Sequence, residues 1–137
     1  MVKMTLQTMT SSGKPSINNV IYSKETFEKM LEKQKDFKFK LCTGTDYYSD
    51  IEHYTVVRPE TIVADVNCIR DGSIDISVSD DKVDYINKIL DDGYVPGMRY
   101  MGKLSKPDKE GGICEVTDIH LICYDFVTSK RPNCIQE

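Results

Sequence analysis

Hydrophobic and polar residues alternate along much of this chain, as in strands that bury one face. Met4 to Thr10 and Phe37 to Thr43 alternate in this way. Two more β-rich runs, Glu60 to Ile69 and Ser73 to Ser79, are joined by Arg70-Asp71-Gly72-Ser73. Asp-Gly is a strong hairpin signal because glycine tolerates a positive φ. The two runs are therefore predicted to form a β-hairpin.

A first helix is predicted from about Lys24 to Lys35. Ser23 before it is a good N-cap, because its hydroxyl can accept a bond from a backbone N–H of the first turn. Tyr22 and Phe27 have the spacing of a hydrophobic staple. The apolar stripe of this helix consists of Phe27, Met30 and Leu31.

A second helix is predicted to begin at Asp80 or Asp81, either of which could cap it, and to end at Gly93. Its inward residues are Val83, Ile86, Ile89 and Leu90. Met98 to Leu104 is read as a strand, and Ile113 to Val127 as one bent strand or two. About seven strands and two helices, mostly linked by hairpins, indicate an α+β domain built on a bent antiparallel sheet or barrel.

Composition favours a globular protein. The 137 residues are 39% hydrophobic and 29% charged, which suits one domain over 1–137 with an irregular tail over 129–137. The net charge is -4, and the basic residues are spread along the chain, so no nucleic-acid partner is expected. The longest basic run, Lys33 to Lys40, is interrupted by Asp36 and aromatics and is read as a solvated helix end. No apolar run approaches the roughly 20 residues of a membrane span.

The cysteines and histidines do not indicate a metal or cofactor site. Five cysteines without CxxC spacing argue against a disulfide framework and a zinc site, so reduced thiols in a reducing cytoplasm are expected. Cys42, Cys68, Cys114 and Cys123 fall in strand-like runs. His120 is predicted to be exposed by alternation between Ile119 and Leu121. No metal and no cofactor are expected.

Several segments, taken in order, resemble the phage prohead (capsid-maturation) protease family, whose fold the herpesvirus assembly proteases share. Residues 17–24 lie where the family has an N-x-N-G-R-x-Y-P loop before its first helix. Residues 83–97 correspond to its helix ending in A-G-V-x-x-G, and residues 119–129 to its late strand F-x-L-x-x-F-D-I-V. The resemblance covers nearly the whole chain and implies a prohead-protease-like fold.

The catalytic motifs of that family are altered here. Its nucleophile lies in G-x-S-S-R-G, and the matching residues 97–102 place Arg99 and Tyr100 at the two serine positions. Tyr48 stands where the catalytic His would lie, and Ala64 at the second His. A guanidinium and a phenol cannot replace a serine alkoxide and its base, so no catalytic residue is expected. His53 is a weak candidate for a base.

The tyrosines suggest a binding surface. The resemblance maps Tyr47, Tyr48 and Tyr100 to the walls of the family's substrate cleft, and Tyr54 and Arg99 join them as candidate binding residues. Filling of a cavity left by the lost catalytic groups would explain the same tyrosines equally well.

Three functions remain open. The leading hypothesis is a non-catalytic virion or head-assembly protein, such as an auxiliary or decoration capsid protein, made in the host cytoplasm. Its expected partners are capsid or other virion proteins, in an oligomeric or assembly-bound state without membrane or direct nucleic-acid contact. The alternatives are an active or degenerate maturation serine protease, and a phage factor that binds a host protein or ligand through the former cleft.

Overall fold

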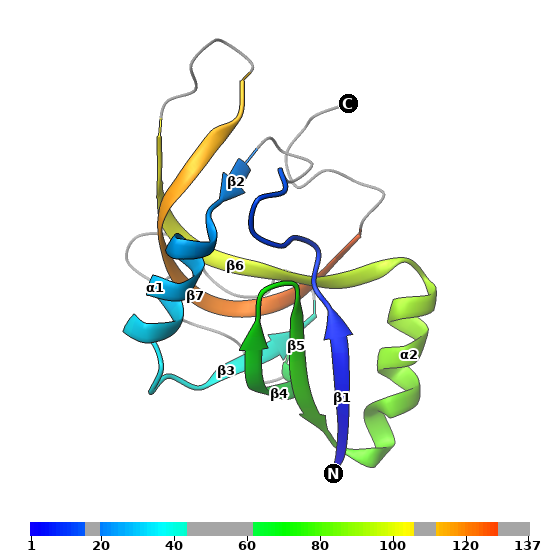
Figure 1. Ribbon diagram of the computed structural model, residues 1–137. Coiled ribbons are helices and arrows are strands. Elements are labelled where there is room, and N and C mark those ends of the chain that lie inside the picture. Colours follow the sequence, from blue (N-terminus) through cyan, green and yellow to red (C-terminus); the bar gives the residue numbers. More distant parts are fainter. Residues whose placement is uncertain (16–19, 44–61, 106–111, 129–137) are drawn as a thin grey trace.

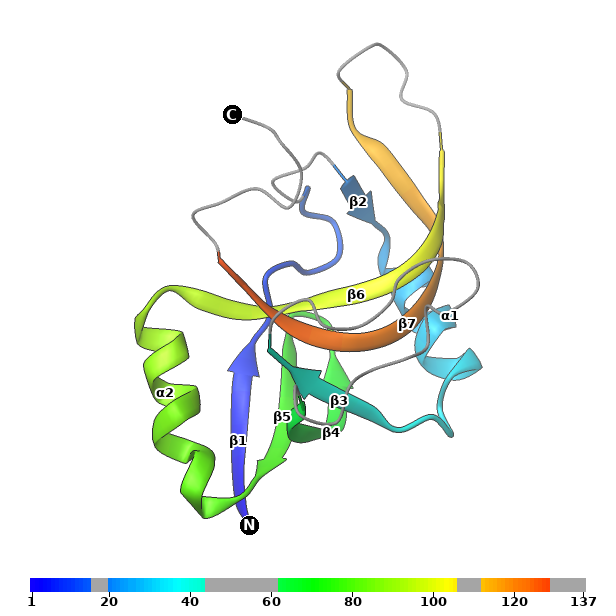
Figure 2. The ribbon, with the colours of Figure 1, turned by 180° about the vertical axis from the view of Figure 1, so that it is seen from behind.

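The computed structural model describes residues 1–15, 20–43, 62–105 and 112–128. Its strands are β1 (Val2–Gln7), β2 (Val20–Tyr22), β3 (Phe39–Cys42), β4 (Ile62–Arg70), β5 (Ser73–Val78), β6 (Tyr94–Leu104) and β7 (Cys114–Thr128). The helices are α1 (Lys24–Lys33) and α2 (Val83–Asp91), which lie at opposite ends of the molecule (Figures 1 and 2). These strands and helices confirm the predicted α+β class. Neither of these helices is long and apolar enough to span a membrane.

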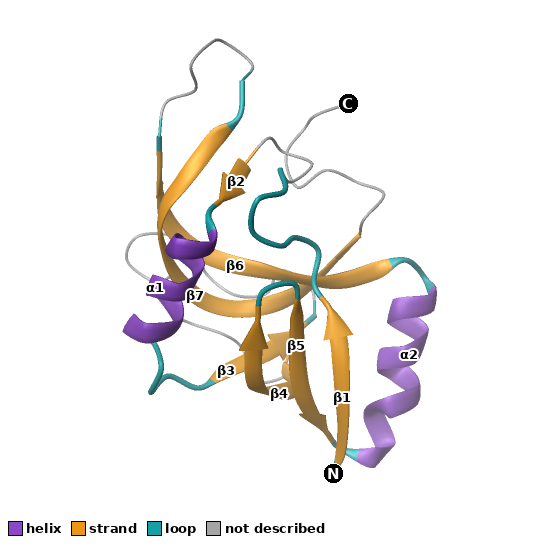
Figure 3. Ribbon diagram, viewed as in Figure 1, coloured by secondary structure: helices purple, strands orange, loops and turns teal. Residues whose placement is uncertain are grey.

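Strand β7 organises the sheet, whose order is β1-β5-β4-β3-β7-β2, with β6 paired to β7 along nearly its whole length. The hairpin-linked pairs are antiparallel as predicted, but β2 and β3 both run parallel to β7. The chain passes from β2 through α1 to β3, and such a crossover gives its two strands the same direction. The sheet is therefore mixed, and it is open rather than a closed barrel (Figure 3).

The predicted hairpin is confirmed. Strands β4 and β5 pair from Arg70 opposite Ser73, and Gly72 in the turn has a φ of 93°. Strand β1 then pairs along the other edge of β5. The sequence left open whether Ile113 to Val127 forms one strand or two. It forms the single strand β7, which bends strongly around the body of the molecule (Figures 1 and 2).

Helix α1 begins as predicted, and the residue that follows its end bonds to β7. The Thr26 N–H donates to the Ser23 hydroxyl at 3.1 Å, and the rings of Tyr22 and Phe27 stack with centroids 5.8 Å apart. On one edge of β7, β2 pairs with residues 114–116 and β3 with residues 124–125. The amide of Gln34, just after α1, bonds both backbone groups of Leu121 between these two pairings.

Helix α2 differs from the prediction at its start. Residues Asp80–Lys82 form a 3-10 turn, and neither aspartate caps α2, whose N-cap is Lys82 without a side-chain bond. The carboxylate of Asp81 turns back to Ser79 instead, and this hydrogen bond lowers the pKa of Asp81. The inward face is as predicted, with Ile86 fully buried, and Gly93 ends the helix with a φ of 95°.

The core lies between the sheet and the two helices. Its fully buried aliphatic side chains come from strands and α2 alike, namely Leu41, Ile74, Ile76, Val78, Ile86, Val116, Ile119 and Leu121. Burying each such side chain contributes roughly 1.5–3 kcal/mol. Strand β7 contributes Val116, Ile119 and Leu121 to this core, and β6, which carries the positions matched to the protease motif, pairs with it.

Candidate functional site

Both glycines of the motif segment 97–102 are required by the close pairing of β6 with β7. A Cβ on Gly102 would lie 2.5 Å from the backbone oxygen of Asp118, and one on Gly97 would lie 2.9 Å from the Val127 side chain. A side chain at Gly102 would require the β7 backbone to shift, and one at Gly97 would require the Val127 side chain to move. The six-residue spacing of these glycines therefore has a structural cause that is independent of catalysis.

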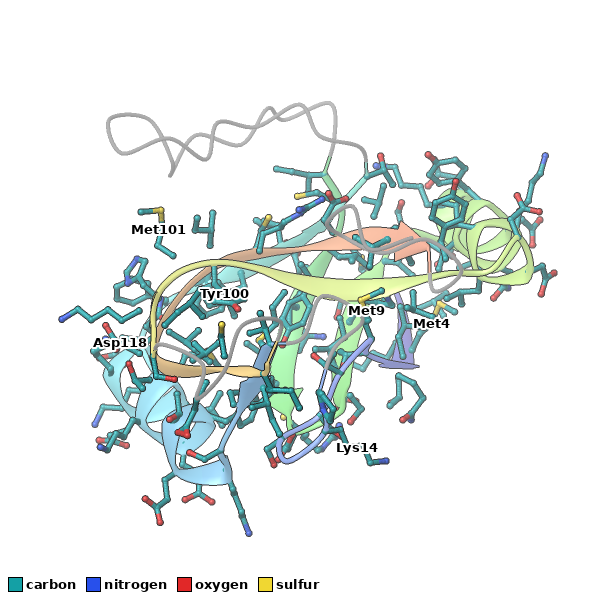
Figure 4. All side chains as sticks on the ribbon, turned by 90° about the horizontal axis from the view of Figure 1, so that it is seen from above. Met4, Met9, Lys14, Tyr100, Met101 and Asp118 are labelled. Carbon is teal, nitrogen blue, oxygen red and sulfur yellow. The ribbon has the colours of Figure 1, made fainter. Side chains whose placement is uncertain are left out.

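A bulge in β7 lies opposite the two positions matched to the family's serines. Arg99 pairs with Cys123 and Tyr100 with Leu121, so Ile122 is the extra residue. Arg99 lies on the face that carries Asp125, while Tyr100 packs against the core. Figure 4 shows Tyr100 inside the curve of β6 and Met101 on the other side.

Arg99 is tied to a buried carboxylate. The side chain of Asp125 is 1% exposed and that of Arg99 is 34% exposed. Nε and Nη2 of Arg99 both donate to Oδ2 of Asp125, at 3.4 and 3.3 Å. An ionised carboxylate at this depth needs a compensating cation, so the guanidinium is a structural counter-ion.

Two buried thiols lie beside this ion pair. Cys42 is the β3 residue opposite Asp125, and Cys123 lies two residues before Asp125 on β7. A hydrogen bond with Cys42, followed by burial, raises the pKa of Cys123. Since the thiolate is the nucleophilic form, Cys123 is poorly suited to replace the missing serine.

The phenol of Tyr100 keeps its proton at neutral pH. Burial raises its pKa, and its neighbour Tyr22 has a pKa raised to about 12, again mainly by burial. The Tyr22 hydroxyl donates to the backbone oxygen of Thr10 at 3.4 Å. These phenols pack the interior and do not supply a base.

The structure places two of the candidate residues that it describes, Ala64 and Arg99, on opposite faces of the sheet. Leu41 pairs with both Ala64 and Tyr124, so Ala64 belongs to the core face and is buried there. Arg99 lies with Asp125 on the opposite face, because side chains alternate along a strand. Ala64 and Arg99 are therefore not brought together.

The remaining candidates, Tyr47, Tyr48, His53 and Tyr54, lie outside the described residues.

His120 is half-buried, whereas the sequence predicted exposure. The ring of Phe37 packs edge-on against it, with centroids 6.0 Å apart. Alternation could not reveal this contact, because Phe37 comes from the segment after α1. Within the described ranges, no three His, Cys, Asp or Glu side chains gather as a metal site would require.

Sequence reasoning missed Asp125, although a signal was present. Asp125 is the one charged residue between Leu121 and Val127, in a run that is otherwise apolar or aromatic. A buried strand seldom carries an isolated carboxylate without a partner. That mismatch could have directed attention to Arg99 as its counter-ion.

Comparison with known proteins supports the fold. No protein-family model matches the chain, and no curated protein matches it. Among solved structures, it is similar to the bacteriophage T4 capsid assembly protease, gp21, with a TM-score of 0.62. The match covers 91% of this chain and 80% of that chain at 16% sequence identity. The chain therefore has a phage prohead-protease-like fold, as the motifs implied.

Proposed function

We propose that this chain is a bacteriophage head-assembly protein that uses a prohead-protease-like fold without serine-protease chemistry. Within that class, an auxiliary or decoration protein of the capsid is the role that the chain fits best. The observation that carries the proposal is the segment between Gly97 and Gly102. There Arg99 neutralises the buried Asp125, and Tyr100 packs against the core.

Acyl transfer needs a nucleophile and a base within hydrogen-bond reach of it. Both residues at the matched positions are committed to packing and charge compensation. A guanidinium held by a carboxylate has no nucleophilic lone pair. A partly buried phenol whose pKa is raised by burial is a poor nucleophile. This arrangement supports a protein that binds its partners and leaves them uncut.

The head-assembly part of the proposal rests on the neighbour's fold. The T4 neighbour is described as a capsid assembly protease. A domain whose ancestor bound capsid proteins could keep that binding after losing its protease activity. Since one fold can host many functions, particle composition is the decisive test.

Quantitative mass spectrometry of purified proheads and mature particles from the source phage tests the proposal. We expect the intact 15.6 kDa chain in many copies per particle. Its absence from both particles would contradict the assembly role and favour a factor that acts elsewhere in the infected cell.

A second measurement tests the missing chemistry. The purified chain is incubated with the head proteins of the same phage and, separately, with a fluorophosphonate that labels active serines. We expect no cleavage and no labelling. Cleavage that disappears in a His53→Ala variant would instead establish an active, rearranged peptidase.

A further inference from the structure

The two halves of the sheet meet in a short strand pairing. Strands β1, β5, β4 and β3 form one half, and β2, β7 and β6 form the other. Leu41 and Cys42 on β3 pair with Tyr124 and Asp125 on β7, and we call these two residue pairs the β3–β7 seam. Between described strands this is the shortest ladder, since β2 and β7 share three pairs and β6 and β7 share eleven. Few backbone hydrogen bonds therefore join the two halves at the seam.

Two buried thiols lie on either side of this seam. Cys42 is 0% exposed and Cys123 is 1% exposed. Because side chains alternate along a strand, both lie on the face of the sheet that carries Asp125, away from the core face of Leu41 and Tyr124. The two thiols share a hydrogen bond, so their sulfur atoms are neighbours across the seam.

Each of these cysteines adjoins an irregularity in the strand pairing. The register of β3 against β4 shifts between Leu41 and Cys42, and on β7 the extra residue Ile122 immediately precedes Cys123. Such irregularities bend a strand and re-aim its side chains. Cys123 lies diagonally across from Cys42, since Asp125 is the residue directly opposite. With two irregularities and a short ladder, a small backbone shift can bring the two Cβ atoms to the roughly 3.5–4.5 Å that a disulfide requires.

We propose that Cys42 and Cys123 form a reversible disulfide that links β3 to β7 at the seam. The thiols stay reduced in a reducing compartment, and the bond forms in oxidising surroundings. The oxidant is a small disulfide such as oxidised glutathione. One cysteine thiolate displaces a glutathione thiolate to give a mixed disulfide, and the second cysteine then displaces the other glutathione. The two thiol protons pass to the two glutathione thiolates, and glutathione gains the two electrons that the cysteines lose.

The cross-link would stabilise the fold where its backbone pairing is shortest. It closes a long loop of chain between β3 and β7, which restricts the unfolded state more than a short loop does. Buried, protonated thiols react slowly, so the exchange proceeds when the seam opens, and the exposed Cys68 reacts with the oxidant first. This inference goes beyond the proposed function and does not depend on it.

Incubation of the purified full chain in mixtures of reduced and oxidised glutathione tests the cross-link. After the remaining thiols are blocked, peptide mapping by mass spectrometry without reduction identifies the cysteines that are joined. We expect a Cys42–Cys123 disulfide that forms without denaturant and opens again with dithiothreitol. The melting temperature of the oxidised protein should exceed that of the reduced protein by about 5 °C or more.

Two variants separate this pair from the other cysteines. Cys123→Ala should abolish both the cross-link and the rise in melting temperature. Cys68→Ala removes an exposed thiol and should leave both unchanged. In the unaltered chain, Cys42 and Cys123 that stay reduced at every glutathione ratio would overturn the proposal. So would a cross-link that forms only after unfolding in urea or joins other cysteines, or an oxidised protein no more stable than the reduced one.

Discussion

Gln34 provides the sharpest test of how the fold is held together. Its side chain is 3% exposed and lies against β7 between the stretches that pair with β2 and β3, where no other described strand reaches that edge. Its Nε2 donates to the backbone oxygen of Leu121 at 3.0 Å, and its Oε1 accepts from the Leu121 N–H at 2.8 Å. One side-chain amide thus does for Leu121 what a neighbouring strand would do.

Gln34→Met keeps the length of the side chain and removes both bonds. The Leu121 N–H and C=O would then lose these partners in a buried place, at about 1–3 kcal/mol for each group. Partial relief by water gives an expected loss of about 2–4 kcal/mol in the free energy of unfolding. This is a large share of the roughly 5–15 kcal/mol of a typical domain.

Urea unfolding followed by far-UV circular dichroism measures this change, because the chain has no tryptophan for fluorescence. Lys35→Met is the matched control. It replaces the exposed next residue and should change the free energy of unfolding by less than about 0.5 kcal/mol. Amide exchange adds a local readout, since the Leu121 N–H should lose protection in Gln34→Met. A variant as stable as the control would refute the role assigned to Gln34.

Three further predictions concern packing, pH and thiol access. Gly102→Ala should lower the melting temperature more than a typical surface substitution, because its Cβ would meet the backbone of β7; an unchanged melting temperature would contradict the pairing of β6 with β7. Burial raises the pKa of Tyr22 from 10.0 to about 12, so folding favours the protonated phenol. The stabilisation that the protonated Tyr22 side chain provides is therefore complete below pH 10 and is lost as pH rises through 12. Alkaline unfolding should therefore be shallower in Tyr22→Phe, and an identical pH profile would count against this assignment. With a thiol reagent on the native protein, mass spectrometry should find Cys68 modified well before Cys42 and Cys123, which are buried; similar rates at all three would contradict their placement.

Local signals in the sequence predicted much of the fold. The Asp-Gly turn, the Ser23 cap and the Tyr22 staple depend on neighbouring residues, and each was confirmed. The predicted N-cap of α2 was wrong, because the Asp81 carboxylate forms a hydrogen bond with Ser79 and does not cap the helix. Such competition between nearby polar groups depends on the backbone path, which local propensity does not determine.

Long-range features could not be predicted in the same way. The parallel pairing of β2 and β3 with β7 depends on how α1 crosses between them, and no periodicity encodes it. The motif spacing located Arg99 and Tyr100 correctly on one strand. It did not reveal that Arg99 serves the buried Asp125, since that contact depends on the register of β6 against β7.

The central place of β7 has a consequence for folding on the ribosome. Strands β2, β3 and β6 all pair with a strand that is synthesised after them, and the bonds from Gln34 to Leu121 span 87 residues of chain. Contacts so far apart in sequence form slowly, because a long loop must close before they contribute. The β2–α1–β3 crossover can reach its final arrangement only after β7 has left the exit tunnel. Until then the apolar surfaces of this crossover remain exposed and prone to aggregate, so we expect the emerging chain to bind chaperones.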